Sequence, residues 1–189
     1  SENISQDDQI LQIIQEFMLI DGWLNVREAC ELYKIAKSLT GENLVLCEIG
    51  SWLGRSSYVL AKAIKNKKKS YLYCIDPFDG TGDESSRTIY KQKQDALLNK
   101  SLLEKFNENM KKMGVSDIIR IIQGYSFEII KKFNKPIDLL FIDGSHDYKS
   151  VLNDYLQWSP LVKKGGYIAF HDVVASHTTG PKQVVEQEI

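Results

Sequence analysis

The stretch "IDGSHDY" (142–148) places two reactive side chains close together, directly behind the apolar run "IDLLF" (137–141). Asp143 offers a carboxylate, and His146 follows three residues later. An imidazole has an ordinary pKa of roughly 6.5, which suits it to take up a proton near neutral pH. The stretch predicts a catalytic pair of Asp143 and His146. The alternative is an ordinary strand end, in which His146 only stabilises the turn before a helix that begins near Asp147.

Acidic residues also end three other apolar runs of the chain. Glu48 stands in "CEIGSWLG", Asp76 closes "YCID", and Asp172 follows His171 in "YIAFHD". Ligands of open parallel sheets bind beyond the carboxyl ends of the strands. One such acid is often only a turn former. The acids together predict one shared site for a nucleoside.

Glycines near these strand ends favour the same interpretation. Gly50 and Gly54 follow the first strand, where they permit a tight turn and close approach of a ligand to the backbone. A later strand ends in Gly124, Tyr125 and Ser126. The signatures GxxxxGK[ST] and GxGxxG are absent, which argues against a P-loop NTPase and weakens NAD as the ligand. The pattern "YVLAK" (58–62) is similar to a dehydrogenase Tyr-x-x-x-Lys pair, but it lies on a helix remote from a catalytic position.

The elements that would position these residues alternate between strand and helix. Short apolar runs predict strands at 44–50, 70–76, 118–124, 137–143 and 167–172. Apolar residues at helical spacing, with a capping box of Asn25 and Glu28, and helical composition predict helices at 9–20, 26–39, 56–65, 87–113, 127–133 and 148–158 and at the end of the chain. Such alternation is typical of an α/β fold. We expect a Rossmann-like doubly wound, mainly parallel sheet with helices on both faces.

Length and composition predict a single domain at 1–189, with N-terminal helices at 1–42 and a cofactor-binding α/β core at 43–189. The 24 basic and 25 acidic side chains nearly cancel, so no nucleic acid partner is expected. No apolar run reaches the roughly 20 residues that cross a bilayer, so no membrane partner is expected either. Three cysteines without a CxxC pair and a polar N-terminus suggest a reducing, cytoplasmic location.

These motifs, in this order, carry a family resemblance. The stretches "LCEIGSWLGRSSYVLAKAI", "YCIDPFDG", "IIQGYS" and "IDLLFIDGSHDYKSVLNDYLQWSPLVKKGGYIAFHDV" together resemble class I S-adenosylmethionine-dependent methyltransferases. More narrowly, they are similar to the branch that contains macrocin-type sugar O-methyltransferases and cephalosporin-hydroxylase-like proteins. The resemblance runs from about residue 20 to residue 185.

The resemblance implies a cofactor, S-adenosyl-L-methionine, and a place for each part of it. The methionine moiety would lie against Glu48, Gly50 and Ser51, with Gly54 completing the turn. Asp76 would hold the ribose hydroxyls, and the adenine would lie beside Phe78 and be flanked by Gly124, Tyr125 and Ser126. Asp143 would face the sulfonium.

The resemblance also raises a divalent cation such as Mg²⁺ as a second cofactor. All three histidines, His146, His171 and His177, fall at or after the last two strands. Asp143, His171 and Asp172 are the predicted ligands, and a cation there would lower the pKa of a substrate hydroxyl. Metal-using relatives carry two adjacent acids where this chain has His171-Asp172, and hard cations prefer oxygen. A structural, hydrogen-bonded His171 therefore remains the alternative.

The implied activity is O-methylation of a hydroxyl on a small molecule or sugar. A cofactor-binding module without turnover and a nicotinamide-dependent oxidoreductase remain as alternatives. The family fold adds a C-terminal strand hairpin that is apparently missing here, and an exposed sheet edge would favour a homo-oligomer. We expect the segments 79–90 and 177–183 to cover the site as lids.

Overall fold

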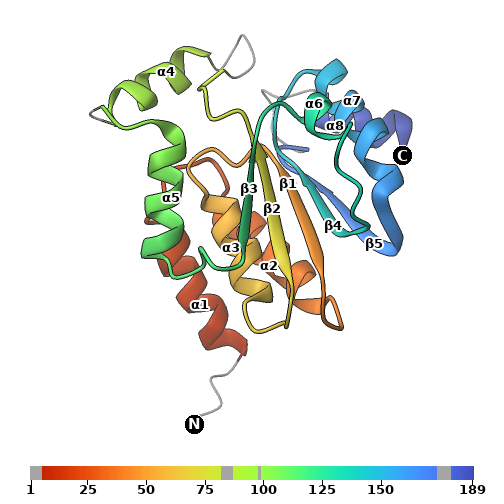
Figure 1. Cartoon of the computed structure of the whole chain (residues 1–189), viewed down its shortest axis with the longest axis horizontal. Helices are drawn as coiled ribbons and strands as arrows, with labels where there is room; N and C mark the ends of the chain where they lie inside the picture. The colour runs from red at the N-terminus through yellow and green to blue at the C-terminus, as the bar shows by residue number, and fades with distance from the viewer. Residues whose placement is uncertain (1–5, 82–86, 98, 174–179) are drawn as a thin grey trace.

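The computed structural model describes residues 6–81, 87–97, 99–173 and 180–189. Its centre is a parallel sheet with the strand order β3-β2-β1-β4-β5 (Figure 1). The strands are β1 (Val45–Ile49), β2 (Tyr71–Asp76), β3 (Ile119–Gln123), β4 (Ile137–Ile142) and β5 (Val162–Phe170). The chain runs outward from β1 to β3 and then returns to add β4 on the other side of β1. The strand order therefore reverses between β1 and β4, the place where such sheets bind ligands.

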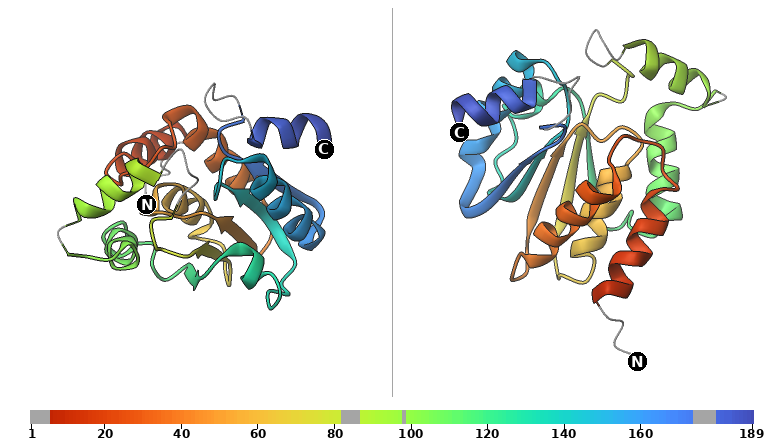
Figure 2. Two further views of the ribbon diagram at one scale, coloured as in Figure 1. Left: turned by 90° about the horizontal axis from the view of Figure 1, so that it is seen from above. Right: turned by 180° about the vertical axis from the view of Figure 1, so that it is seen from behind.

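Helices cover both faces of this sheet, as predicted. The helices are α1 (Gln6–Phe17), α2 (Val26–Ser38), α3 (Arg55–Ile64), α4 (Arg87–Asp95), α5 (Leu102–Lys112), α6 (Ser126–Ile129), α7 (Tyr148–Trp158), the 3₁₀ turn η1 (Ser159–Leu161) and α8 (Gly180–Glu188). Helices α1, α2, α3 and α5 lie on one side of the sheet, and α6, α7 and α8 lie on the other (Figures 1 and 2).

Each face of the sheet buries its own apolar cluster. Neighbouring residues of β1 divide between them: Leu46 packs with Phe17, Tyr58 and Phe106 on one face, and Cys47 packs with Trp158 on the other. Because both faces are covered, the strands are nearly continuous apolar runs, which is why the sequence predicts them well. Cys47 and Cys74 are buried free thiols.

The N-terminal helices pack onto α3. Ile13 and Phe17 of the predicted apolar face are buried, but Met18 is 54% exposed because α1 ends at Phe17. The predicted capping box of α2 is confirmed: Asn25 Oδ1 accepts from the Glu28 backbone N–H at 3.0 Å, and Glu28 Oε2 accepts from the Asn25 N–H at 3.0 Å. The buried side chains hold α1 against the helix layer of the sheet, and the capping box fixes the start of α2.

The Tyr-x-x-x-Lys pattern on α3 connects this helix to α1. The Tyr58 hydroxyl donates to the Glu16 carboxylate of α1, and Lys62 Nζ lies 3.2 Å from the same carboxylate. Tyr58 is fully buried.

Within the described residues, no helix has both the length and the apolar character that crossing a membrane demands.

Three predicted boundaries were wrong. The range 87–113 forms two helices instead of one, because Ser101 caps α5 through a second capping box with Glu104 and Asn99 takes a left-handed φ of 72°. The strand predicted at 167–172 begins earlier, because the stretch "KKGG" (163–166) lies inside β5, whose register shifts opposite Ile137–Leu139. The predicted helix at 127–133 is reduced to the four residues of α6.

Candidate active site

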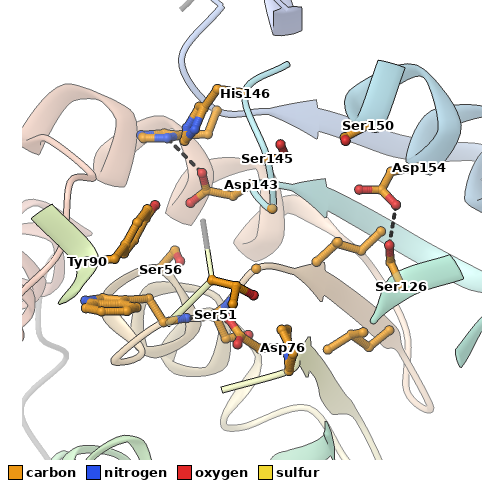
Figure 3. Close-up of a pocket in the computed structure, with 18 of the residues that line it drawn as sticks. Ser51, Ser56, Asp76, Tyr90, Ser126, Asp143, Ser145, His146, Ser150 and Asp154 are labelled. Atoms are coloured by element: carbon orange, nitrogen blue, oxygen red, sulfur yellow. Dashed lines mark hydrogen bonds and ion pairs between the residues drawn. The ribbon is translucent and has the colours of Figure 1, made fainter. Parts of the chain in front are cut away.

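A cavity of about 540 Å³ opens at the carboxyl ends of the strands (Figure 3). It lies where the strand order reverses, between residues from both halves of the sheet. Ten of the residues predicted to form the site line it: Gly50, Ser51, Asp76, Gly124, Tyr125, Ser126, Asp143, His146, His171 and Asp172. Side chains that are far apart in the chain therefore meet at one rim of the sheet, as expected. Of the two predicted lids, residues 82–86 and 177–179, with His177, lie outside the described residues.

The turn after β1 allows the ends of β1 and β4 to approach each other closely. Gly50 has a φ of 86°, and a Cβ at this position would overlap the carbonyl oxygen of Asp143 and lie 2.7 Å from the Cα of Gly144. The Asp143 N–H donates to the Ile49 carbonyl at 2.8 Å. Glycine is therefore required at position 50 both for its backbone conformation and for the space it leaves.

Trp52, in the same turn, has a φ of 47°, which is strained for a bulky residue. Its ring contacts Trp23 of the α1–α2 connection and Tyr90 of α4, with centroid distances of 5.6 and 4.9 Å. Trp23 and Tyr90 also contact each other at 4.9 Å. These three rings, which we call the aromatic wall, bring an N-terminal loop, the glycine turn and α4 together on one side of the cavity.

Asp76 connects the end of β2 to the glycine turn. Its Oδ2 accepts from the backbone N–H groups of Ser51 and Trp52 at 2.8 and 2.9 Å, and its Oδ1 accepts from the Phe78 N–H at 2.6 Å. Burial raises the pKa of this carboxyl, while the three N–H groups act in the opposite direction. Three of its roughly four acceptor positions are thus used within the protein. The predicted contacts to two ribose hydroxyls must compete with this role.

Glu48, Gly54 and Phe78 do not line the cavity, unlike the other predicted site residues. Gly54 begins α3 with a φ of 93° and lies against Phe106. Phe78, with a φ of 53°, turns its ring into the core, where it contacts Phe106 at 5.3 Å. Phe78 therefore lies outside the cavity, although it is only two residues from Asp76 in the sequence.

Glu48 lies fully buried beneath the glycine turn. Its carboxylate accepts from the hydroxyls of Ser51 at 2.7 Å, Ser56 at 2.6 Å and Ser57. Burial raises the pKa of Glu48 to about 7, although these three hydroxyls lower it. Ser51 and Ser56 line the cavity. The effect of Glu48 on a ligand is therefore indirect, through the serines that it orients.

This burial predicts a dependence of stability on pH. The pKa of Glu48 is raised from 4.5 to about 7. The contribution of this group to the unfolding free energy is therefore fully present below pH 4.5 and is lost as the pH rises through 7. The expected loss is about 3 kcal/mol of unfolding free energy. In Glu48→Gln this component should disappear, which urea titrations of both proteins from pH 5 to pH 8 measure. Equal pH slopes for the two proteins would contradict the assignment.

One end of the cavity, which we call the charged end, is formed by Asp143, His146, His171 and Asp172. It is centred on His171, which is 5% exposed. His171 Nδ1 lies 2.9 Å from Asp143 Oδ1 and 3.5 Å from Asp172 Oδ2, and its Nε2 lies 3.2 Å from Glu28 Oε2. Burial alone would lower the pKa of His171, but Asp143, Asp172 and Glu28 together raise it to about 9. His146 Nε2 lies 3.2 Å from Asp172 Oδ2.

Several possible metal-binding atoms of the charged end lie close to one another. The predicted ligands Asp143 and Asp172 both lie within 3.5 Å of His171 Nδ1. Among the described residues, the sets whose donor atoms lie close enough together to hold one metal ion are Asp143–His146–His171 and Glu28–His171–Asp172. The buried His171 Nδ1 faces carboxylate oxygens of Asp143 and Asp172 at 2.9 and 3.5 Å. A buried imidazole nitrogen that faces two carboxylates at such distances fits a metal ligand, and a bound cation would replace the Nδ1 proton.

A second acid, which the sequence did not single out, lies in the cavity wall formed by α6 and α7. Asp154 is 5% exposed, and its Oδ1 accepts from the Ser126 hydroxyl at 2.5 Å (Figure 3). Burial raises the pKa of Asp154 to about 6. Its only sequence signal was an acid on the otherwise apolar face of the helix at 148–158. The aromatic wall had no comparable signal, because its members come from three separate segments.

The chain matches a family of methyltransferase domains over residues 47–173. An uncharacterized protein of Acanthamoeba polyphaga mimivirus is 32% identical over 146 residues, which cover 75% of this chain and 57% of that relative. The chain thus spans little more than half of the relative's length.

Solved structures with a similar fold include three O-methyltransferases. The O-methyltransferase NovP has a TM-score of 0.66 and 18% identity, covering 86% of this chain and 70% of NovP. TomG from Streptomyces achromogenes, solved with SAM, has a TM-score of 0.61 and 17% identity, covering 99% and 73%. An enzyme from Bacillus cereus, solved with SAH, has a TM-score of 0.59 and 14% identity, covering 92% and 70%. The fold is the Rossmann-like fold of class I methyltransferases, and the chain belongs to the methyltransferase domain family.

Proposed function

We propose that the protein transfers a methyl group from S-adenosylmethionine to a hydroxyl of a small molecule, with a sugar or glycosylated metabolite as the expected class. The observation that carries this proposal is the meeting, across one cavity, of the glycine turn with the Asp143–His146 end of the sheet. The first is suited to a nucleoside cofactor and the second to proton removal. Membership of the methyltransferase domain family supports the same reaction.

The cofactor would extend from the glycine turn toward α6. Its methionine moiety would contact Gly50 and Ser51, and its ribose would lie near Asp76. The adenine would reach Ser126 and Asp154, where a buried carboxylate can accept a hydrogen bond from an exocyclic amino group. In this position the sulfonium would face Asp143, in agreement with the role that the sequence predicted.

Transfer of an activated methyl group requires alignment and removal of one proton. The methyl carbon must lie between the acceptor oxygen and the cofactor sulfur, which the cavity walls would enforce. His146 would accept the proton of the hydroxyl, and Asp172, 3.2 Å from its Nε2, would hold the imidazole in one orientation. This assigns His146 the role of general base and Asp172 the role of its orienting group.

The charged end would also hold a divalent cation. Asp143 and Asp172 would offer oxygen atoms, and His171 would offer Nδ1, which faces both carboxylates at 2.9 and 3.5 Å. A bound divalent cation would lower the pKa of the acceptor hydroxyl.

The aromatic wall would contact the acceptor. Trp23, Trp52 and Tyr90 line the cavity, and Trp23 is 43% exposed. Indole and phenol rings present broad apolar faces together with a polar atom, which suits the mixed surface of a sugar or phenol ring. We therefore expect the acceptor to bind between this wall and His146. A reducing compartment such as the cytoplasm suits the chain's free cysteines.

Binding of S-adenosylhomocysteine tests the cofactor assignment without an acceptor. Calorimetry of the wild-type protein should detect one site, and NAD should not bind there. Asp76→Ala removes the acceptor of three N–H groups at the glycine turn, so its affinity should fall about tenfold to 100-fold. The control, Asp117→Ala, removes an exposed acid before β3 and should leave affinity unchanged. Binding of NAD in place of S-adenosylhomocysteine would overturn the proposal in favour of an oxidoreductase.

Turnover is then measured as S-adenosylhomocysteine released in the presence of sugar, glycoside and phenol acceptors. Release that depends on one acceptor class would support methyl transfer and identify that class. Tight cofactor binding with no release for any acceptor would instead favour a binding module without turnover.

A further inference from the structure

Glu28 is an N-terminal residue that reaches the charged end of the cavity. It lies in the first turn of α2, where its Oε2 accepts from the Asn25 N–H at 3.0 Å as part of the capping box. The same oxygen lies 3.2 Å from His171 Nε2, across 143 residues of sequence. The side chains of Glu28 and His171 are 29% and 4% exposed. One carboxylate therefore contacts both the start of α2 and the most buried polar side chain of the charged end.

The two nitrogens of His171 have different surroundings. Nε2 faces Glu28 at 3.2 Å, and Nδ1 faces Asp143 at 2.9 Å and Asp172 at 3.5 Å. In a neutral imidazole only one nitrogen carries hydrogen, and the hydrogen bond made by that nitrogen decides which one it is. With a cation at Nδ1 the ring would keep one hydrogen, on Nε2, where Glu28 accepts it.

We propose that Glu28 is a positioning residue for the cation site: its carboxylate accepts the Nε2–H of His171 and so directs the Nδ1 lone pair toward a divalent cation held with Asp143 and Asp172. This inference rests on the cation of the proposed function. A carboxylate that receives the second N–H of a metal-binding histidine fixes the ring and increases its basicity. Glu28 occupies this place for His171.

The inference assigns a role to the N-terminal helices. The family match begins at residue 47, so Glu28 comes from outside the matched region. The backbone N–H of Asn25 fixes the Glu28 side chain, and α2 packs on α3 through the buried residues Ala29, Leu32 and Ala36. The orientation of His171 in the charged end is therefore set by a helix that precedes the matched domain.

Calorimetric titration with Mn²⁺ tests the inference without an acceptor or turnover. Glu28→Ala should weaken Mn²⁺ binding by about 10-fold to 100-fold. Its affinity for S-adenosylhomocysteine, measured without metal, should stay unchanged, which also shows that the variant is folded. Two controls are matched to it. Glu31→Ala removes an exposed acid of the same helix, and Asn25→Ala removes the cap but keeps Glu28. Both should bind Mn²⁺ like the wild type.

Glu28→Gln separates positioning from charge. Glutamine can still complete the capping box, and its amide oxygen can still accept from His171 Nε2. We expect Glu28→Gln to recover most of the Mn²⁺ affinity that Glu28→Ala loses. A stability effect alone would not produce such recovery together with normal affinity in Asn25→Ala.

The failures of the two proposals are distinguishable. Equal Mn²⁺ affinity of Glu28→Ala and the wild type would overturn the inference and leave the proposed cofactor untouched. Absence of Mn²⁺ binding in the wild type would also overturn it, even if S-adenosylhomocysteine binds. Failure of S-adenosylhomocysteine to bind, with Mn²⁺ binding that depends on Glu28, would overturn the proposed function and support the inference.

Discussion

Gly50→Ala should destabilise the protein by about 3 kcal/mol or more and abolish binding of S-adenosylhomocysteine. Two effects add at this position. The φ of 86° disfavours any side chain, and the new methyl group would overlap the Asp143 carbonyl. Relief would require the ends of β1 and β4 to separate, and these strand ends form the floor of the cavity. Urea denaturation and calorimetry measure the two expected losses.

Gly41→Ala is the matched control for this prediction. Gly41 has a φ of 96°, but apart from its two chain neighbours no atom of the described residues lies within 4 Å of the position where its Cβ would be. This variant carries the conformational cost alone, so it should lose about 1 kcal/mol and bind the cofactor normally. If both variants behave alike, the close contact between the glycine turn and β4 does not determine the site.

His146→Ala should lower kcat by about 100-fold to 10,000-fold, because the acceptor hydroxyl would lose its general base. Binding of S-adenosylhomocysteine should be unchanged, since the predicted cofactor contacts lie elsewhere in the cavity. The measurement is the rate of methyl transfer at saturating cofactor, with whichever acceptor class gives turnover.

Added imidazole provides the control for the His146 prediction. A free imidazole that enters the space left by His146→Ala should restore part of the rate, whereas it should not affect the wild type. Unchanged kcat in His146→Ala would remove this residue from the mechanism. A reduced kcat without rescue, accompanied by weaker cofactor binding, would point to a structural role for the His146 loop.

Much of the sheet could be predicted because its signals are local. Strands β1, β2 and β4 are mostly apolar, and polar residues stand at or just after their carboxyl ends. Asp76, Asp143, His146 and Asp172 were found in this way. The division of 87–113 into two helices was also readable, since Ser101 and Glu104 form a capping box that the helical composition around it obscured.

The missed features depend on backbone direction or on distant contacts. Phe78 directly follows the Asp76–Pro77 pair, but its φ of 53° directs the ring into the core, and no local pattern reports that conformation. Glu28 was recognised only as a capping residue, because its second partner lies 143 residues away. No local pattern showed that three backbone N–H groups of the protein bind the Asp76 carboxylate.

The left-handed backbone of Trp52 has a consequence for redesign of acceptor choice. At this position a small, flexible residue would relieve backbone strain, while the large ring contributes to the surface that an acceptor would meet. Replacing Trp52 by a small residue should therefore stabilise the turn and, at the same time, remove part of the surface that an acceptor would contact. Trp23 and Tyr90 have no such backbone strain, so a mutant library that aims to change specificity alone should begin with those two positions.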